Sequence, residues 1–154
     1  MLNVAIIGTG GIAPLHIKGY LTFKEDVNIV ALCDIYPEKA EKMAADFDLD
    51  VTIYDDHEEL LANESIDLVS VCTPPYVHAE IAINAMKAGA HAVVEKPMAA
   101  SLKECDDMNR VSEETGKTLS IISAYASIGE EGLRITSLSW FILHNEISSF
   151  HRLS

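Results

Sequence analysis

The stretch LNVAIIGTGGIA, residues 2–13, determines how the rest of the chain is interpreted. Its first half, Leu2–Ile7, is a continuous apolar run, as in a strand buried on both faces. Its second half, Gly8-Thr9-Gly10-Gly11-Ile12-Ala13, fits the pattern G-x-G-x-x-A where such a strand would turn into a helix. In dinucleotide-binding folds the first glycine permits the tight turn, the second lets the backbone approach a pyrophosphate, and a small third residue allows close helix–strand packing. The helix that follows would offer free N–H groups to the anion.

An acidic residue follows the glycine motif at the distance that a dinucleotide site requires. Asp34 ends a second apolar run, Asn28–Cys33, and a carboxylate there can accept hydrogen bonds from the adenosine ribose. Taken separately, the glycines could form an ordinary tight turn and Asp34 could be a solvated acid; together they favour a dinucleotide site. Asp34 would repel a 2′-phosphate, and neither Ile35 nor Tyr36 supplies a basic clamp, so the sequence favours NAD over NADP. Lys39, one helical turn further on, leaves that choice open.

Strand-like and helix-like segments alternate along the first 123 residues. Runs rich in Val, Ile and Leu predict strands at 2–7, 28–33, 51–54, 67–72, 91–95 and 118–123. Helices are predicted at 12–23, 37–47, 57–62, 75–88 and 101–115. This alternation predicts right-handed βαβ units and therefore an α/β domain over 1–123 with a doubly wound parallel sheet of about six strands, the Rossmann type.

The predicted helices also carry signals at their ends and along one face. Ser101 and Glu104 form the Ser-x-x-Glu pattern of a capping box at the start of the last helix. Gly89 and Gly116 are expected to end two of the helices in the left-handed conformation. In the fourth helix, the apolar positions expected on the buried face are Val77, Ile81, Ala85 and Ala88.

The charge balance and the cysteines narrow the class of protein. The 154 residues include 11 Lys and Arg against 24 Asp and Glu, a net charge of −13, which argues against nucleic acid and against an anionic membrane surface. No apolar run approaches the roughly 20 residues that span a bilayer, and the N-terminus has no basic region of a signal peptide. Cys33, Cys72 and Cys105 are odd in number and lack CxxC spacing, which predicts reduced thiols. We therefore expect a cytoplasmic protein.

Two further groups are expected at the carboxyl ends of the fourth and fifth strands, where ligands of open α/β sheets bind. The first is Thr73-Pro74-Pro75-Tyr76-Val77-His78, whose prolines stiffen the turn and leave the Thr73 hydroxyl facing the cleft. His78 could instead be a surface or helix-capping histidine. The second is Glu95-Lys96-Pro97. A lysine beside a cofactor can carry out acid–base chemistry, although Lys96 taken on its own is more readily explained as a solvated loop residue.

Together these groups resemble the N-terminal domain of the glucose–fructose oxidoreductase / inositol 2-dehydrogenase family. The matching stretches are AIIGTGGIAPLH (5–16), CDIYPEKAEKMAADF (33–47), SVCTPPYVHAEIAINAMKAGAHAVVEKPMA (70–99) and SLKECDDM (101–108). The resemblance covers about residues 1–123 and is specific, because the glycine loop, the TPP…H turn and the EKP turn occur in the same order. In that family the domain is a Rossmann fold that binds NAD or NADP, and the reaction is hydride transfer on a sugar or polyol hydroxyl.

The resemblance implies a role for each matching residue. The pyrophosphate would be held by Gly8, Thr9, Gly10, Gly11 and Ile12. The adenosine ribose would be held by Asp34 and Ile35; the nicotinamide side would be lined by Thr73, Pro74 and His78; and Glu95 would also touch the cofactor. Lys96 would contact the substrate and assist proton transfer, which makes it the expected catalytic residue.

The segment 124–154 does not resemble the family. It holds four of the ten aromatic residues, Tyr125, Trp140, Phe141 and Phe150, and predicts one helix or a strand and a helix. Family members continue into a second α/β domain that supplies the remaining substrate contacts and most of the oligomer interface. We expect that substrate domain to be absent here, as in a truncated or frame-shifted product, and we expect little turnover.

These observations favour an NAD-binding domain related to sugar or polyol dehydrogenases. The alternative is a non-catalytic nucleotide-binding or interaction module; the EKP turn disfavours a non-redox Rossmann protein. Apolar surface left without the second domain predicts a homo-oligomer. The six histidines are scattered without ligand spacing to cysteines or carboxylates, so no metal site is expected. The particular sugar or polyol substrate cannot be inferred from these residues.

Overall fold

A computed structural model of the chain describes residues 1–122, 126–129 and 132–135. The chain divides into two units, 1–121 and 122–154, which are described separately. The strands are β1 (Leu2–Ile7), β2 (Val27–Cys33), β3 (Thr52–Tyr54), β4 (Leu68–Val71), β5 (His91–Glu95) and β6 (Leu119–Ile122). The helices are α1 (Ala13–Leu21), α2 (Pro37–Asp46), α3 (His57–Asn63), the 3₁₀ turn η1 (Pro75–Val77), α4 (His78–Lys87) and α5 (Leu102–Thr115).

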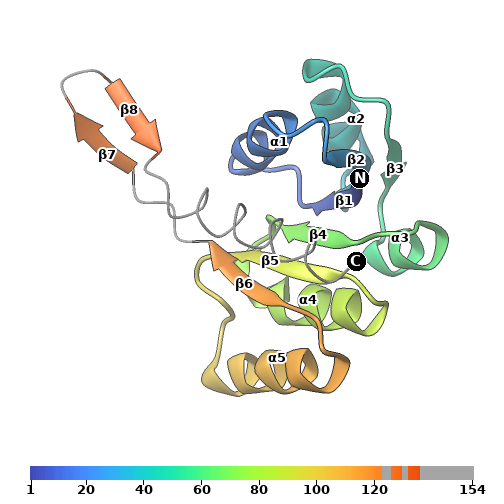
Figure 1. Cartoon of the computed structure of the whole chain (residues 1–154), viewed down its shortest axis with the longest axis vertical. Coiled ribbons are helices and arrows are strands. Elements are labelled where there is room, and N and C mark those ends of the chain that lie inside the picture. The colour runs from blue at the N-terminus through green and yellow to red at the C-terminus, as the bar shows by residue number, and fades with distance from the viewer. Residues whose placement is uncertain (123–125, 130–131, 136–154) are drawn as a thin grey trace. The chain divides into compact units, whose positions relative to one another are not determined.

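The six strands form one sheet in the order β3-β2-β1-β4-β5-β6 (Figure 1). β1 pairs in parallel with β2, from Leu2 opposite Val27 to Ile7 opposite Cys33. On its other side β1 pairs in parallel with β4, so the chain reverses its direction of travel across the sheet beside β1. This order is that of the doubly wound Rossmann sheet, whose ligands bind at such a switch point. The predicted α/β fold with about six strands is therefore confirmed.

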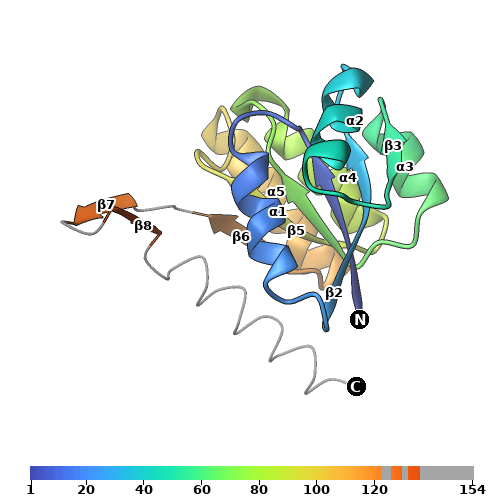
Figure 2. The ribbon, with the colours of Figure 1, turned by 90° about the horizontal axis from the view of Figure 1, so that it is seen from above.

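Alternate residues of the strands face two different helix layers, because side chains along a strand point to opposite faces. Ala5 and Ile7 of β1 belong to a core that also contains Leu60 of α3, Ala82 of α4 and Met108 of α5. The side-by-side packing of α4 on α5 is visible in Figure 1, and Figure 2 shows the sheet from another side, with α1 in front of it. Central strands buried on both faces explain why their sequences are apolar without strict alternation.

The fourth predicted helix differs from the expectation in two ways. It is divided into the 3₁₀ turn η1 and the helix α4, because the extended backbone of Pro74 leads into a single tight turn in which the Val77 N–H bonds to the Pro74 carbonyl. The buried face is also broader than predicted: Ile81 and Ala85 are buried as expected, but Val77 is half-buried and Ala88 is exposed. Helix α4 packs against the sheet and against α3 and α5, and these contacts bury additional positions, namely His78, Ala79, Ala82 and Met86.

Helix ends follow the predicted signals. The Ser101 hydroxyl accepts the Glu104 N–H at 3.3 Å and donates to the Glu104 carboxylate at 3.0 Å. Gly89 and Gly116 have positive φ, as the left-handed residue after a helix requires. The peptide bond between Lys96 and Pro97 is cis.

Replacing Ser101 by alanine is expected to lower the free energy of unfolding by about 1 kcal/mol, because the N–H of Glu104 loses its side-chain acceptor. Urea unfolding followed by circular dichroism measures the change. Glu113→Ala, on the exposed side of the same helix, is the control and should stay within about 0.5 kcal/mol of the wild type. Equal effects from both substitutions would show that the cap contributes nothing specific.

In the second unit, β7 (Ala126–Gly129) pairs antiparallel with β8 (Gly132–Ile135), with Ala126 opposite Ile135 and Gly129 opposite Gly132. The sequence-based expectation of one helix, or a strand and a helix, did not foresee this strand pair. Tyr125, Trp140, Phe141 and Phe150, which set this segment apart in the sequence, lie outside the described residues. Within the described part of the chain, no helix combines the length and apolarity that crossing a membrane requires.

Candidate functional site

A cleft of about 470 Å³ opens at the carboxyl ends of β1, β2 and β4. Six of the predicted site residues line it: Gly8, Gly10, Asp34, Ile35, Thr73 and Pro74. They come from three separate stretches of sequence, which meet because the three strands are neighbours in the sheet. The other predicted residues, Thr9, Gly11, Ile12, His78, Glu95 and Lys96, lie outside this lining.

Gly8 is the point at which the first turn passes closest to the neighbouring strand. Its φ is +92°, and a Cβ atom there would lie 2.7 Å from the carbonyl carbon of Cys72 and 2.8 Å from the Thr73 nitrogen. Those are backbone atoms of the loop that follows β4, so they cannot move aside as a flexible side chain would. The position therefore requires glycine for two independent reasons, backbone conformation and space.

Asp34 ties the glycine loop to the end of β2. One of its carboxylate oxygens accepts the Thr9 N–H and the Thr9 hydroxyl, both at 2.8 Å, and the other accepts the Tyr36 N–H at 3.0 Å. Burial raises the pKa of Asp34, but the hydrogen bonds from Thr9 and Tyr36 and the positive charge of Lys39 outweigh it, so the pKa lies below its ordinary value. Asp34 is thus an ionised acceptor on the cleft wall. Thr9 itself is buried.

The first turn of α1 is left open toward the loop. No side chain caps its N-terminus, where Ile12 is the capping residue, and no acidic residue occupies its first turn. A Cβ on Gly10 or Gly11 would meet no atom within 4 Å, so the space in front of the loop is empty of protein. Within this turn the Ala13 N–H bonds to the Gly10 carbonyl at 3.2 Å, the Leu15 N–H bonds to the Ile12 carbonyl at 3.0 Å, and Pro14 has no N–H. The free helix N–H groups expected from the sequence are therefore not available, but the positive helix dipole and the unobstructed approach still suit an anionic group such as a pyrophosphate.

The loop that follows β4 contributes a polar atom, the Thr73 hydroxyl, to the wall of the cleft. The Thr73 hydroxyl is buried and has no hydrogen-bond partner among the described residues. Cys33 and Cys72 also line the cleft; burial raises the pKa of both thiols to about 12, so they stay neutral. The Thr73 hydroxyl and the glycine-rich loop fit a polar ligand that fills the cleft, as a dinucleotide would.

His78 lies beneath the cleft instead of lining it, and it is 0% exposed. Its Nδ1 is 2.9 Å from the Pro97 carbonyl oxygen and its Nε2 is 2.7 Å from that of Thr73. The alternative of a surface histidine is therefore wrong. Its ring joins the turn after β4 to the turn after β5, and its place on the nicotinamide side stays a prediction.

Glu95 is held by residues that the sequence interpretation did not single out. Its Oε1 is 2.9 Å from His16 Nε2, and its Oε2 accepts the Lys96 N–H at 3.2 Å. His16 Nδ1 is 2.6 Å from the Ser70 hydroxyl, which also accepts from the Tyr20 hydroxyl at 3.1 Å. Glu95 and His16 are each 8% exposed, and Ser70 and Tyr20 are buried as well.

The charge on Glu95 follows from this buried network. Burial raises the pKa of Glu95, but the hydrogen bond and charge of His16 and the neighbouring Lys96 outweigh it, so the pKa is lowered and the carboxylate is ionised. It accepts the Nε2 proton of His16, and the other ring nitrogen of His16 lies against the Ser70 hydroxyl, which accepts from Tyr20. The sequence signal that could have identified His16 is its position one turn into the helix that follows the glycine loop. Its partner on β5 is visible only in the fold.

Lys96 follows Glu95 at the end of β5, and its side chain is exposed. Its backbone is anchored by the Glu95 carboxylate, so the buried network sets where this lysine leaves the sheet. Lys96 is not part of the cleft lining.

The outer rim of the cleft is unusually apolar for exposed positions. Ile35 is 76%, Tyr36 51% and Tyr76 73% exposed, and all three line the cleft. The Lys39 ammonium lies 4.4 Å from the centre of the Tyr36 ring. Flat apolar side chains at the mouth of a cleft suit a planar aromatic ligand group.

A Rossmann sheet with a glycine turn at β1, an acidic residue after β2 and a cleft at the switch point defines a dinucleotide-binding domain. The chain belongs to the oxidoreductase family with an NAD-binding Rossmann fold, whose model matches residues 2–123. The resemblance seen in the sequence is thereby confirmed, as is NAD as the cofactor of the family.

The relatives include sugar and polyol dehydrogenases. The chain is 33% identical to D-glucoside 3-dehydrogenase of Escherichia coli (strain K12) over 118 residues, covering 77% of this chain and 33% of that protein. It is 31% identical to inositol 2-dehydrogenase/D-chiro-inositol 3-dehydrogenase of Lactiplantibacillus plantarum, covering 76% of this chain and 33% of that protein. This chain thus spans about a third of the length of these relatives.

Solved structures agree with this assignment. The WlbA dehydrogenase from Bordetella pertussis, crystallised with NADH and UDP-GlcNAcA, matches with a TM-score of 0.76 and 26% identity over 80% of this chain and 37% of that chain. Myo-inositol 2-dehydrogenase from Lactobacillus plantarum matches with a TM-score of 0.71 and 25% identity over 79% of this chain and 36% of that chain.

Proposed function

We propose that this chain binds NAD(H) in the cleft at the switch point and forms the cofactor half of a sugar or polyol dehydrogenase. The observation that carries the proposal is the combination of the open α1 N-terminus with the ionised Asp34 on one cleft. The backbone of Gly8, Gly10, Gly11 and Ile12 would hold the pyrophosphate. Asp34 would accept from the adenosine ribose with the lone pairs that Thr9 and Tyr36 leave free.

The remaining predicted residues act on the nicotinamide side of this proposal. The Thr73 hydroxyl, which has no partner in the described structure, would bond a polar group of the cofactor, and Pro74 would pack beside it. His78 would hold the Thr73 and Pro97 turns in place from below. When bound, the nicotinamide supplies the hydride acceptor or donor.

Lys96 is proposed as the residue that contacts the substrate hydroxyl and holds or moves its proton. The support is its place at the end of β5, directly after a carboxylate anchored to α1 through His16. Glu95 would orient the Lys96 backbone and place a negative charge beside the ammonium group, which keeps the lysine close to the turn.

Calorimetric titration with NADH is expected to give one site per chain with a Kd of about 0.1 mM, and NADPH should bind at least about tenfold more weakly. The reason is that the Asp34 carboxylate would repel a 2′-phosphate. Asp34→Asn should narrow the ratio between the two cofactors. Asp55→Asn removes a charge from another residue of the same cleft and serves as the control, which should leave the ratio unchanged. No detectable NADH binding at about 1 mM would contradict the proposal.

An absorbance assay at 340 nm with inositol or a related sugar separates the two remaining interpretations. NAD reduction that is lost in Lys96→Ala, with NADH binding retained, would support a dehydrogenase with Lys96 at the substrate. NADH binding without any reduction would instead support a nucleotide-binding module.

A further inference from the structure

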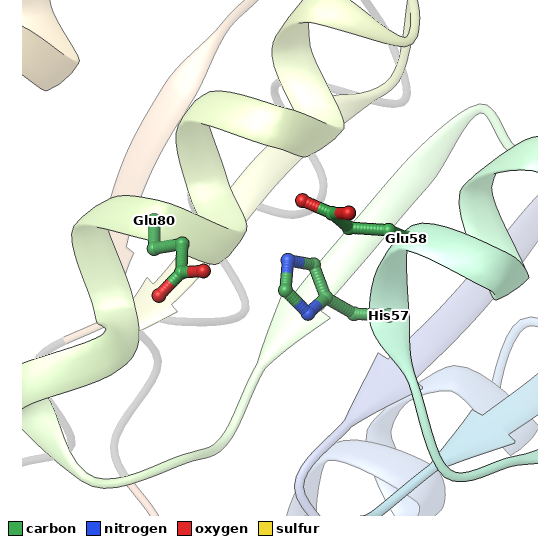
Figure 3. A group of neighbouring side chains, drawn as sticks. All are labelled: His57, Glu58 and Glu80. Carbon is green, nitrogen blue, oxygen red and sulfur yellow. The ribbon is translucent and has the colours of Figure 1, made fainter.

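Three potential metal ligands converge where α3 lies beside α4. They are His57 and Glu58 at the start of α3 and Glu80 near the start of α4. One ligand atom from each, an imidazole nitrogen and two carboxylate oxygens, lies within 4.8 Å of the others (Figure 3). Ligands bound to one first-row metal at about 2.1 Å are separated by roughly 3 to 4.3 Å, so only a small adjustment of these side chains is needed.

A fourth side chain, Asn84, contacts two of these three ligands. The Asn84 amide nitrogen lies 3.1 Å from His57 Nε2 and 3.1 Å from Glu58 Oε1. Because an ionised carboxylate only accepts, the amide must present its NH₂ group here, and His57 Nε2 must then accept as well. His57 therefore directs an unprotonated nitrogen into the cluster, the form in which imidazole binds a metal.

Asn84 could also complete the ligand shell. Rotating its amide by half a turn replaces the nitrogen with the carbonyl oxygen at nearly the same place. The distances of 3.1 Å from that place to His57 Nε2 and to Glu58 Oε1 equal the edge of an octahedron with bonds of about 2.2 Å. The cluster then offers one nitrogen and three oxygens.

The backbone that carries these ligands is well held. The Asp56 carboxylate caps α3 by accepting the N–H groups of Glu58 at 2.7 Å and Glu59 at 3.1 Å. Leu60 of α3 and Ile81 of α4 are buried in the core below. Ligands on two packed helices keep their spacing better than ligands on a loop.

The local charge also favours a cation. Asp55, Asp56 and Glu59 adjoin the cluster in sequence, and within the described residues neither Glu58 nor Glu80 forms an ion pair with lysine or arginine. His57 and Glu80 both line the cleft, so a small ion can reach them from solvent.

We propose that His57, Glu58 and Glu80, with Asn84, form a binding site for a divalent first-row transition-metal ion on the wall of the cleft. The imidazole favours such an ion over Mg²⁺ or Ca²⁺. Because the set contains oxygen ligands and no thiolate, it favours ions that accept oxygen ligands, such as Zn²⁺, Mn²⁺ or Co²⁺. A bound ion joins α3 to α4. The proposal does not depend on whether the cleft binds a dinucleotide.

Titration of the full chain with Co²⁺, followed by calorimetry and by visible absorption, tests the site. The wild type should bind one equivalent more than His57→Ala, and Glu80→Gln should bind that equivalent at least about tenfold more weakly. Glu59→Gln removes the same charge from an exposed neighbour on α3 and should change the affinity by less than about twofold. Co²⁺ should also raise the Tm of the wild type but not of His57→Ala.

Circular dichroism verifies that the variants are folded, which the exposed position of Glu80 favours. Binding that is unchanged in both His57→Ala and Glu80→Gln would overturn the proposal. Equal weakening by Glu59→Gln would also overturn it, because it would indicate diffuse attraction to the acidic surface. Thiolate-to-cobalt charge-transfer bands would assign the metal to cysteines and refute the site as well.

Discussion

Alanine at position 8 is expected to lower the free energy of unfolding by about 3 to 5 kcal/mol and to abolish NADH binding. The added methyl group would lie 2.7 Å from the backbone of Cys72, and alanine would also have to adopt a φ of +92°. Relief of either strain would move the glycine turn away from β4, at the point where the cleft begins. Urea unfolding and NADH calorimetry measure the two effects.

Substitutions at two other glycines distinguish an effect on stability from an effect on NADH binding. Gly19 lies in α1 with open space around it, so Gly19→Ala should raise stability by up to about 1 kcal/mol and leave NADH binding intact. Gly10 also has open space, but it lines the cleft, so Gly10→Ala should leave stability within about 0.5 kcal/mol while weakening NADH binding strongly. If Gly8→Ala were as stable as the wild type, the close approach to Cys72 would not constrain this turn.

Removal of His16 is the second substitution with a large expected effect, about 3 kcal/mol of unfolding free energy. His16→Ala leaves the Glu95 carboxylate, 8% exposed, without its side-chain partner and also leaves a cavity beside Ser70. Tyr20→Phe removes only one neutral hydrogen bond to Ser70 and should cost about 1 kcal/mol.

A double-mutant cycle measures the interaction energy between His16 and Glu95. His16→Ala and Glu95→Ala should together cost clearly less than the sum of the two single changes, because once one partner is gone the other has little left to lose. Additive losses would mean that the two side chains contribute independently. Lys18→Ala, on the exposed side of α1, controls for the loss of a long side chain from this helix and should stay near the wild type.

The same pair predicts the direction of a pH effect. Because the folded state lowers the pKa of Glu95, its contribution to stability is present above the ordinary carboxyl pKa and is lost as the pH falls through the folded value. Without His16, burial is the main influence, and the Glu95 carboxyl would be stabler in its protonated form. The deficit of His16→Ala should therefore be largest near neutral pH and should shrink below about pH 4, as unfolding measured from pH 3 to 7 would show.

Much of the fold could be predicted because its signals are local. Apolar runs separated by periodic segments predicted all six strands of the sheet, and β1 and β5 begin and end at the predicted residues. Ser101 and Gly89 predicted helix ends through short-range hydrogen bonding and backbone conformation. The division between η1 and α4 was missed because a proline pair is compatible both with a helix start and with a separate tight turn.

The sequence by itself determined the class of site, since the spacing from Gly8 to Asp34 reflects one helix and the strand that follows it. Only the tertiary structure decided which side chains meet across that framework. His16 of α1 meets Glu95 because α1 packs on the sheet face to which Ser70 of β4 and Glu95 of β5 point, and His57 meets Glu80 because α3 lies beside α4. The spacing of the histidines in the sequence provided no signal for these contacts. The contacts join residues that are distant along the chain, and the packing of helices on a common sheet brings those residues together.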